Sequence, residues 1–154
     1  MIKKIKNKVV ISDLDGTIAL IEHLRHHVEK EKKDWDAFNQ EIDKDEPNIP
    51  IIECLKSLKA AGYLIYIYTG RVDSTKDKTE KWLKDNNVEY DEMRMRPSAS
   101  RIDDTKLKKN WLDWDFPTEE EKKNILCVFE DRDKMVKMWR DQGLVCMQVA
   151  EGNF

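Results

Sequence analysis

Acidic and polar side chains follow three apolar runs of the chain, and their types and spacing suit chemistry on a charged ligand. These groups are Asp13 and Asp15 after the run VVIS, Thr69-Gly70-Arg71 after residues 63–68, and Glu130-Asp131-Arg132 after residues 125–129. Ligands of open α/β sheets bind beyond the carboxyl ends of the strands. If the three runs are parallel strands, we expect the three groups to meet at one edge of the sheet.

Carboxylates that converge from two strands repel one another unless a cation lies between them. A hard divalent ion such as Mg²⁺ prefers carboxylate oxygens and keeps further positions for water and phosphate oxygens. The acids at positions 13, 15, 130 and 131 therefore predict a metal site with chemistry beside it.

Each of these motifs alone also has a purely structural interpretation. The DxDG stretch could be a turn in which Asp13 bonds its own backbone. Thr69-Gly70 could be an ordinary end of a strand, and Glu130-Asp131-Arg132 a solvated start of a helix. A calcium loop does not fit, because the third acid and the closing Glu are missing and a strand precedes the motif. The occurrence of all three motifs after strands favours the functional interpretation.

The apolar runs themselves predict a parallel sheet. They are nearly continuous rather than alternating, as is typical of strands that are covered on both faces. The predicted strands cover residues 9–11, 63–68, 125–129 and 144–149, with a weaker one within 88–95.

Segments with helical spacing separate these strands. We expect one helix that starts at Asn48 and Pro50 and ends at Gly62, and a second over residues 75–86. A third is capped by Asp104 and carries Leu107, Trp111 and Trp114. A fourth is capped by Asp133 and ends at Gly143. The alternation of strands and helices predicts a doubly wound, Rossmann-like α/β fold. Residues 1–154 are expected to form a single domain.

One connection is longer than the fold requires. About thirty residues follow the first strand, whereas βα loops usually take about two to six. We expect residues 18–47, approximately, to form a small lid, in which Trp35, Phe38 and Ile42 have helical spacing. The stretch EHLRHH holds His23, His26 and His27 without the spacing of a zinc site, so a solvated segment is favoured over a metal role.

Composition narrows the class of protein. The chain has 154 residues, 40% hydrophobic and 38% charged, and a formal charge of −3, so any nucleic-acid contact must be a local patch. Cys54, Cys127 and Cys146 lie among apolar residues and are interpreted as reduced core thiols of a cytoplasmic protein. No signal-peptide core or membrane-length apolar run occurs, so we expect neither secretion nor membrane insertion.

The motif series resembles that of haloacid-dehalogenase-type phosphatases. DLDGT, TGR, a later lysine and EDR occur in the family's order, each acidic or TGR motif after a predicted strand. The closing stretch KMVKMWRDQGLVCMQVAEGNF is more similar still to the 3′-phosphatase domains of bacteriophage polynucleotide kinase-phosphatases. The resemblance covers nearly the whole chain, but the lid matches only loosely, through DWDAF and DEPN.

The resemblance implies roles for the residues in these motifs. Asp13 would be the nucleophile that forms an aspartyl-phosphate, and Asp15 would protonate the leaving oxygen and then activate water. The substrate phosphate would be bound through the loops that contain Thr17, Thr69, Gly70, Arg71, Arg132 and a lysine. The match of LKKNWL to the family's apolar spacing favours Lys108 as that lysine, with Lys106 as the alternative.

The resemblance also implies a Mg²⁺ site. Asp13, the backbone carbonyl of Asp15, and Asp131 would be its ligands. The family usually has two aspartates where this chain has Glu130-Asp131, so the longer Glu130 is expected to act through a metal-bound water.

The predicted function is a Mg²⁺-dependent phosphatase that removes a 3′-terminal phosphate from DNA or RNA, with opening of 2′,3′-cyclic ends as an additional activity to test. A small lid leaves the cleft open to a polymer end, which the arginines at 94, 96 and 101 could contact. Trp35 and Phe38 could stack on a base or anchor the lid, and anchoring is favoured. Asp45 could orient Arg71 or serve in a turn, and the turn is favoured.

Two other functions stay open. A phosphatase of free nucleotides would share the same motifs, and a non-catalytic scaffold would keep only the fold. No G-x-x-x-x-G-K-[ST] motif occurs, so this chain is not expected to act as a 5′-kinase, and a kinase or ligase partner would be a separate protein. The sequence does not indicate the oligomeric state.

Overall fold

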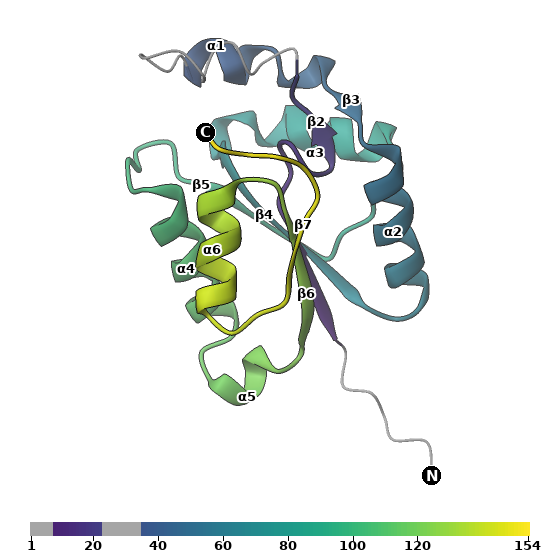
Figure 1. Ribbon diagram of the computed structural model, residues 1–154. Helices are drawn as coiled ribbons and strands as arrows, with labels where there is room; N and C mark the ends of the chain where they lie inside the picture. The colour runs from purple at the N-terminus through teal and green to yellow at the C-terminus, as the bar shows by residue number, and fades with distance from the viewer. Residues whose placement is uncertain (1–7, 23–34) are drawn as a thin grey trace.

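A five-stranded parallel sheet forms the centre of the computed structural model, which describes residues 8–22 and 35–154. Its strands lie in the order β5-β4-β1-β6-β7, and each neighbouring pair is parallel (Figure 1). The bounds are β1 (Val9–Ser12), β4 (Leu64–Val72), β5 (Glu92–Arg96), β6 (Ile125–Glu130) and β7 (Cys146–Gln148). The predicted parallel α/β sheet is confirmed.

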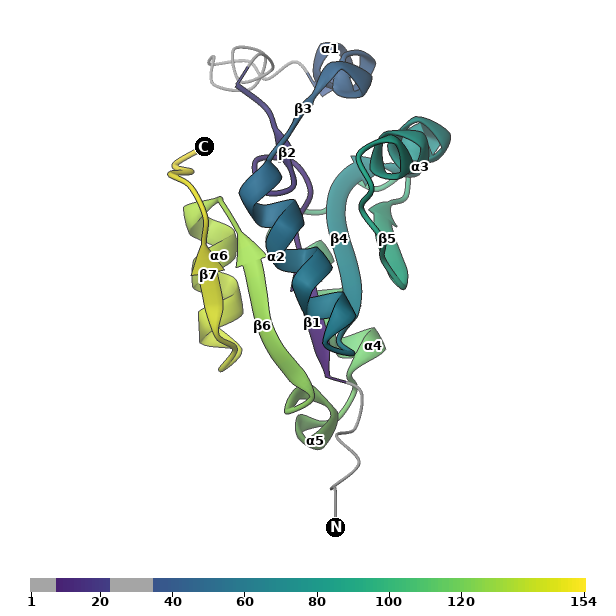
Figure 2. The same cartoon turned by 90° about the vertical axis from the view of Figure 1, so that its right-hand side faces the viewer.

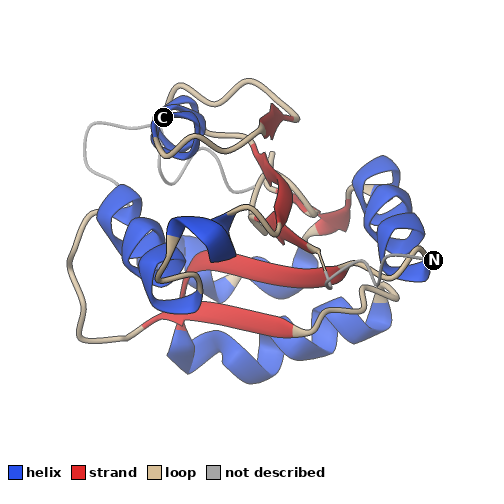
Figure 3. Ribbon diagram, turned by 90° about the horizontal axis from the view of Figure 1, so that it is seen from below, coloured by secondary structure: helices blue, strands red, loops and turns tan. Residues whose placement is uncertain are grey.

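Helices cover both faces of this sheet, as the doubly wound prediction requires. On one face lie α2 (Ile49–Ala60) and α3 (Lys76–Asp85), and on the other lie α4 (Asp104–Asp115) and α6 (Asp133–Asp141) (Figures 1 and 2). Figure 3 shows the same layers from below. A short 3₁₀ turn, η3 (Asp73–Thr75), precedes α3, and a four-residue helix, α5 (Glu119–Lys122), which the sequence analysis did not predict, precedes β6.

Two hydrophobic cores result, because successive side chains of a strand point to opposite faces. Val10 packs in the core beneath α2 and α3, whereas Val9 and Ile11 pack in the core beneath α4 and α6. The strands are apolar at nearly every position because both of their faces are covered.

The insert after β1 lies across the carboxyl ends of the strands (Figure 1). It contains β2 (Ala19–Leu20), α1 (Trp35–Gln40), η2 (Ile42–Lys44) and β3 (Glu46–Pro47), and β2 pairs with β3 in antiparallel fashion. The buried Ile42 anchors it, and the Trp82 indole of α3 donates a hydrogen bond of 2.9 Å to the Asp45 carbonyl. The three predicted lid histidines and the Phe38 side chain lie outside the described part of the molecule.

Helix α4 corrects two predictions. Its cap is Asp103, whose Oδ1 accepts a bond of 2.9 Å from the Thr105 amide, and not Asp104. Trp114 is 79% exposed rather than part of the core. The buried face of this helix instead includes a lysine, Lys108, the residue that the motif series favours over Lys106.

Two further expectations are corrected. The cap position of α6 is Arg132, and Asp133 is the first helical residue, whose Oδ1 accepts a bond of 2.7 Å from Gln148 Nε2. Cys54 is exposed on α2, whereas Cys127 and Cys146 are buried as predicted. Within residues 8–22 and 35–154, none of the helices has the length and apolar character needed to cross a bilayer.

Candidate active site

The register of the central strands brings the sequence motifs together. Ser12 pairs with Ile67 on one side and with Phe129 on the other, so Asp13 leaves β1 level with the start of the other two motifs. The Asp13 amide donates a bond of 2.9 Å to the Phe129 carbonyl. Thr69, Gly70 and Arg71 belong to β4 itself, which extends to Val72 with a register shift after Thr69.

Three carboxylates and one ammonium group meet at this edge, and we call Asp13, Lys108, Glu130 and Asp131 the acid cluster. All four side chains are buried. Lys108 Nζ donates to Asp13 Oδ1 at 2.6 Å and to Glu130 Oε2 at 3.0 Å. The structure thus brings Lys108 into the cluster, whereas Lys106 is exposed on the same helix.

The acid cluster is short of positive charge. Burial, and then the neighbouring Glu130, raises the pKa of Asp13 to about 7. Burial and the charges of Asp13 and Glu130 raise the pKa of Asp131 to about 9. Burial opposes ionisation of Glu130 too, but its contacts with Lys108 keep the pKa of that carboxyl below its ordinary value. One lysine therefore does not balance three buried acids.

The donor set and its surroundings fit a hard divalent cation. One ligand oxygen from each of Asp13, Glu130 and Asp131 lies within 4.8 Å of the others. Asp131 Oδ1 is buried and has no hydrogen-bond partner in the parts of the chain that are described. A Cβ atom at Gly16, whose φ is +82°, would lie 2.1 Å from Asp131 Oδ2, so a glycine is needed here to leave room for this carboxylate. Oxygen donors of this kind are those that Mg²⁺ prefers.

Glu130 is held differently from the two aspartates. Its Oε2 accepts bonds from Lys108 and, at 3.4 Å, from Trp139 Nε1. Its Oε1 accepts a bond of 3.2 Å from the Asp131 amide. Because both of its oxygens already accept hydrogen bonds, the geometry is compatible with the expected indirect role through a bound water.

A second group, Asp15, Asp45, Arg71 and Thr79, forms what we call the arginine shell. The buried guanidinium of Arg71 donates from Nη2 to Asp15 Oδ1 at 2.6 Å and from Nε to both Asp15 oxygens. Nη2 also donates to Asp45 Oδ2 at 2.8 Å, and Nη1 to Thr79 Oγ1 at 3.3 Å.

The arginine shell corrects one expectation. Asp45 does more than serve in a turn, because it binds Arg71 from the insert. All three guanidinium nitrogens of Arg71 donate to protein acceptors, and Arg71 also lines the cleft, so its expected contact with a phosphate stays a prediction. Its geometry suits orientation of the Asp15 carboxylate, which lines the cleft.

Three other predicted site residues lie at different depths. Gly70 lines the cleft, where a Cβ atom would lie 3.0 Å from Asp104 Oδ1. Thr69 is buried, and its Oγ1 accepts a bond of 3.1 Å from the Arg71 amide. Thr17 is buried away from the cleft lining, and its Oγ1 finds no partner within the described residues. The turn at residues 14–19 is closed by backbone bonds instead.

Arg132 lines the cleft and is fixed by residues that the sequence analysis did not assign to the site. Its Nη1 donates to Asp104 Oδ2 at 2.8 Å, and Asp104 also forms an ion pair with Arg96. Its Nε donates to the Phe154 carbonyl at 2.9 Å, and its guanidinium lies 5.2 Å from the centre of the Phe154 ring. The adjacent Asp103-Asp104 pair in the sequence indicates such a role, because a helix needs only one capping residue and the second aspartate is then available to bind another group.

The chain's closing stretch also supports the metal loop. The Gly152 carbonyl accepts a bond of 2.7 Å from the Asp133 amide, and a Cβ atom at Gly152 would lie 2.4 Å from the Asp131 carbonyl. Gln148 Nε2 donates to that same carbonyl at 2.9 Å. The residues around position 150 therefore hold the backbone that presents Asp131.

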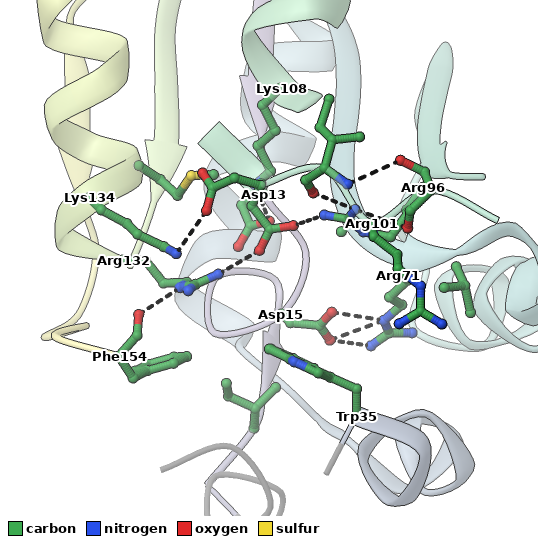
Figure 4. A pocket seen from close by; sticks show the side chains of 18 residues that line it. Asp13, Asp15, Trp35, Arg71, Arg96, Arg101, Lys108, Arg132, Lys134 and Phe154 are labelled. Atoms are coloured by element: carbon green, nitrogen blue, oxygen red, sulfur yellow. Dashed lines mark hydrogen bonds and ion pairs between the residues drawn. The ribbon is translucent and has the colours of Figure 1, made fainter. Parts of the chain in front are cut away.

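The acid cluster and the arginine shell both reach one cleft of about 430 Å³, the first through Asp13 and Lys108 and the second through Asp15 and Arg71 (Figure 4). Asp13 and Lys108 form its floor, with Asp15 beside them, and Trp35 reaches it from the insert. The three arginines expected to contact a polymer separate here. Arg96 and Arg101 line the cleft, but Arg94 does not, because it pairs with Asp115 on α4.

Comparison with known proteins supports the motif assignment. The family model described as the polynucleotide kinase PNKP phosphatase domain matches residues 7–154. A protein of Autographa californica nuclear polyhedrosis virus that carries the name bifunctional polynucleotide kinase/RNA ligase is 28% identical over 140 residues. That match covers 87% of this chain and 18% of the viral protein.

Solved structures show the same relationship. A structure of the Pnkp1/Rnl/Hen1 RNA repair complex contains a chain that matches with a TM-score of 0.79 and 28% identity, over 96% of this chain and 44% of the other. A haloacid dehalogenase-like hydrolase of Streptococcus pneumoniae shares the fold, with a TM-score of 0.56, 12% identity, and coverage of 92% of this chain and 84% of its own.

The chain spans less than half the length of the viral relative and of the matched repair-complex chain. The family assignment does not depend on those longer proteins, because the match to the family model spans every described residue. This chain belongs to the family of polynucleotide kinase PNKP phosphatase domains, which are haloacid-dehalogenase-type hydrolases.

Proposed function

We propose that this protein is a Mg²⁺-dependent phosphatase that removes the 3′-terminal phosphate from DNA or RNA through an aspartyl-phosphate. The observation that carries the proposal is the buried Asp13 carboxylate on the floor of an open cleft, within 2.6 Å of Lys108 and beside two further acids. The similarity to a chain of an RNA repair complex supports a polynucleotide substrate.

The acid cluster supplies the nucleophile. An Asp13 oxygen would attack the phosphorus, the P–O bond to the 3′ carbon's oxygen would break, and the phosphoryl group would be left on Asp13. Asp13, Asp131 and, through water, Glu130 would hold Mg²⁺. Haloacid-dehalogenase-type phosphatases generally use this ion, which when bound neutralises the charge between the two approaching anions. Lys108 Nζ, already bonded to Asp13, would donate to a phosphate oxygen.

Asp15 would act as the general acid and then as the general base. Its carboxyl lines the cleft and would protonate the departing 3′ oxygen, then remove a proton from the water that cleaves the aspartyl-phosphate. In this scheme Arg71 is not required to contact the substrate. It would hold the Asp15 carboxyl in position through the bidentate contact, while Asp45 and Thr79 fix the guanidinium from behind.

Replacement of the nucleophile tests the proposal. Asp13→Asn keeps the size of the side chain but removes the attacking oxygen anion, so release of phosphate from a 3′-phosphorylated oligonucleotide should fall by about 10⁴-fold or more. Asp43→Asn, a matched change at an exposed acid of the insert, should turn over normally. Undiminished turnover by Asp13→Asn would refute the mechanism.

Substrate choice needs a separate measurement. Oligonucleotides with a 3′-phosphate, a 5′-phosphate or a 2′,3′-cyclic phosphate, assayed with Mg²⁺ and with EDTA, report the bond that is cleaved and the metal requirement. We expect Mg²⁺-dependent release from the 3′-phosphate. Release from the 5′-phosphate alone, or equal release with EDTA, would contradict the proposal.

A further inference from the structure

The cleft extends beyond the acid cluster to two side chains that the proposed chemistry does not use. Arg101 lies in the loop between β5 and α4, and its side chain is exposed. Trp35 begins α1 and is 42% exposed. Both line the cleft that contains Asp13 and Asp15. A cation and an aromatic ring are the groups that bind the backbone and the bases of a single strand.

Arg101 differs from the other cations of the cleft. Arg96 forms an ion pair with Asp104, Arg132 binds Asp104 and the Phe154 carbonyl, and Lys134 Nζ lies 3.6 Å from Asp103. None of the described residues forms an ion pair or a side-chain hydrogen bond with Arg101, so its guanidinium can take an anion without losing a protein partner.

The loop that carries Arg101 is nevertheless well held. Arg96 Nη1 donates to the Ile102 carbonyl at 2.7 Å, and the Ser100 amide donates to the Pro97 carbonyl at 2.9 Å. At the other end of the loop, the Ser98 amide donates to Asp73 Oδ1 at 3.1 Å. A fixed backbone with an unpaired cationic side chain limits the ordering that a bound anion must impose.

Trp35 occupies the insert side of the same cleft. Figure 4 draws its ring on the Asp15 side of the cleft, which Trp35, Asp15 and Asp13 all line. A large aromatic side chain that is 42% exposed presents apolar surface to whatever fills the cleft. A nucleobase is a flat apolar surface that gains from this contact whatever its sequence identity.

We propose that Arg101 and Trp35 form a subsite for the nucleotide next to the cleaved end. This subsite rests on the proposed function and specifies how that function would recognise its substrate. With the 3′-phosphate on the acid cluster, Arg101 binds the adjoining internucleotide phosphodiester and Trp35 stacks on an unpaired base. The subsite makes the protein prefer a single-stranded polynucleotide end over a free nucleotide, because a nucleoside monophosphate has no second phosphate for Arg101.

Three small substrates isolate the phosphodiester contact. They are a nucleoside 3′-monophosphate, a 3′-phosphorylated dinucleotide, and the same dinucleotide with a neutral methylphosphonate linkage, made in ribo and deoxy series. The wild-type protein should favour the charged dinucleotide over the neutral one by about three- to fivefold at low salt, mainly in KM. This preference should shrink as salt screens the contact.

Variants connect that preference to the two residues. Arg101→Gln should abolish the preference for the charged linkage, because the contact with the phosphodiester is then already lost. The effects of the substitution and of the neutral linkage on KM should therefore not add up. Lys106→Gln removes the same charge from an exposed position of α4 outside the cleft lining and should keep the preference. Trp35→Ala should raise KM for the dinucleotide by about tenfold, and Trp35→Phe should restore most of that loss.

The outcomes separate this inference from the proposed function. If no substrate of the series is hydrolysed by the wild-type protein, the proposed function fails. If the wild-type protein hydrolyses them but treats charged and neutral linkages alike, or if Arg101→Gln keeps the preference, the subsite is refuted while the phosphatase stands. An effect of Trp35→Ala that Trp35→Phe does not restore would refute the stacking contact.

Discussion

The acid cluster and the arginine shell both reach one cleft, yet their cations are paired in different ways. In the acid cluster, three buried carboxylates share one ammonium group, and the pKa values of Asp13 and Asp131 are raised to about 7 and about 9. In the arginine shell, every nitrogen of the Arg71 guanidinium already has an acceptor among Asp15, Asp45 and Thr79.

The difference indicates what each region needs from outside the chain. On the proposed function, the acid cluster takes up a cation and a phosphate, which would offset the repulsion among its carboxylates. In the arginine shell, protein acceptors already occupy every guanidinium nitrogen of Arg71, so we expect it to hold Asp15 in one orientation. Substitutions in the acid cluster should therefore change metal binding most, and substitutions in the arginine shell should change proton transfer most.

Among the variants that test this comparison, Asp15→Asn should reduce turnover the most. The amide keeps its size but cannot donate the proton that a poor leaving group needs, so turnover of a 3′-phosphorylated oligonucleotide should fall by about 10²–10⁴-fold. p-Nitrophenyl phosphate has a leaving group that departs without protonation, so its turnover should fall much less. Equal losses on both substrates would exclude Asp15 as the general acid.

Lys108→Gln should have the next largest effect. The lysine bonds Asp13 and Glu130, and removal of one such charged donor typically costs about 10²–10³-fold in kcat. The half-saturating concentration of Mg²⁺ should fall at the same time, because the acid cluster then lacks its only internal cation among the described residues. Lys106→Gln is the matched control, and a normal kcat for Lys108→Gln would show that Lys108 serves structure alone.

Asp45→Asn tests the arginine shell through a residue that does not reach the substrate. We expect about a tenfold loss of kcat, because the acceptor behind Arg71 loses its negative charge and the orientation of Asp15 becomes less fixed. Breaking a buried ion pair should also lower the free energy of unfolding by about 3–5 kcal/mol. Urea unfolding beside the exposed control Asp43→Asn measures this, and a variant with normal kcat and a normal pH profile would disprove the positioning role.

Much of the fold and part of the site could be predicted from sequence. The strands are apolar at nearly every position because both faces are covered, and this pattern predicts a parallel sheet directly. Asp13 and Asp131 could be assigned because strand ends in such a sheet share one edge. Their roles stay predictions, since geometry alone does not test a nucleophile.

The rest depends on contacts between distant side chains, which no local pattern encodes. Asp45 was interpreted as a turn residue because its bond to Arg71 joins the insert to β4, 26 positions apart. Asp104 was interpreted as a cap because its neighbour Asp103 carries the same side chain, and only the fold decides which of the two caps the helix. Trp114 had helical spacing but faces away from both cores.

The smallest effect should be seen in the pH dependence of stability, and its response to Mg²⁺ separates the two regions. Burial and the neighbouring Asp15 also raise the pKa of Asp45, in the arginine shell, to about 8, so Asp45 contributes to the same pH dependence. Asp13 and Asp131 have pKa values of about 7 and about 9 in the folded protein against 3.8 for an ordinary aspartate, so the folded state keeps protons that the unfolded state has released. Without metal, stability should therefore be highest at low pH in this range and should fall as pH rises from about 4 toward 9.

Mg²⁺ should offset that loss, because it binds the deprotonated carboxylates and replaces the missing protons. Thermal unfolding with Mg²⁺ and with EDTA should differ by a few degrees at pH 8.5 and by little at pH 6, since ion at about 100 times its Kd adds about 2.7 kcal/mol. Asp131→Asn should reduce the difference at pH 8.5, whereas Asp45→Asn should keep it, because Asp45 belongs to the arginine shell. If Mg²⁺ stabilises equally at both pH values, the three carboxylates do not share one ion.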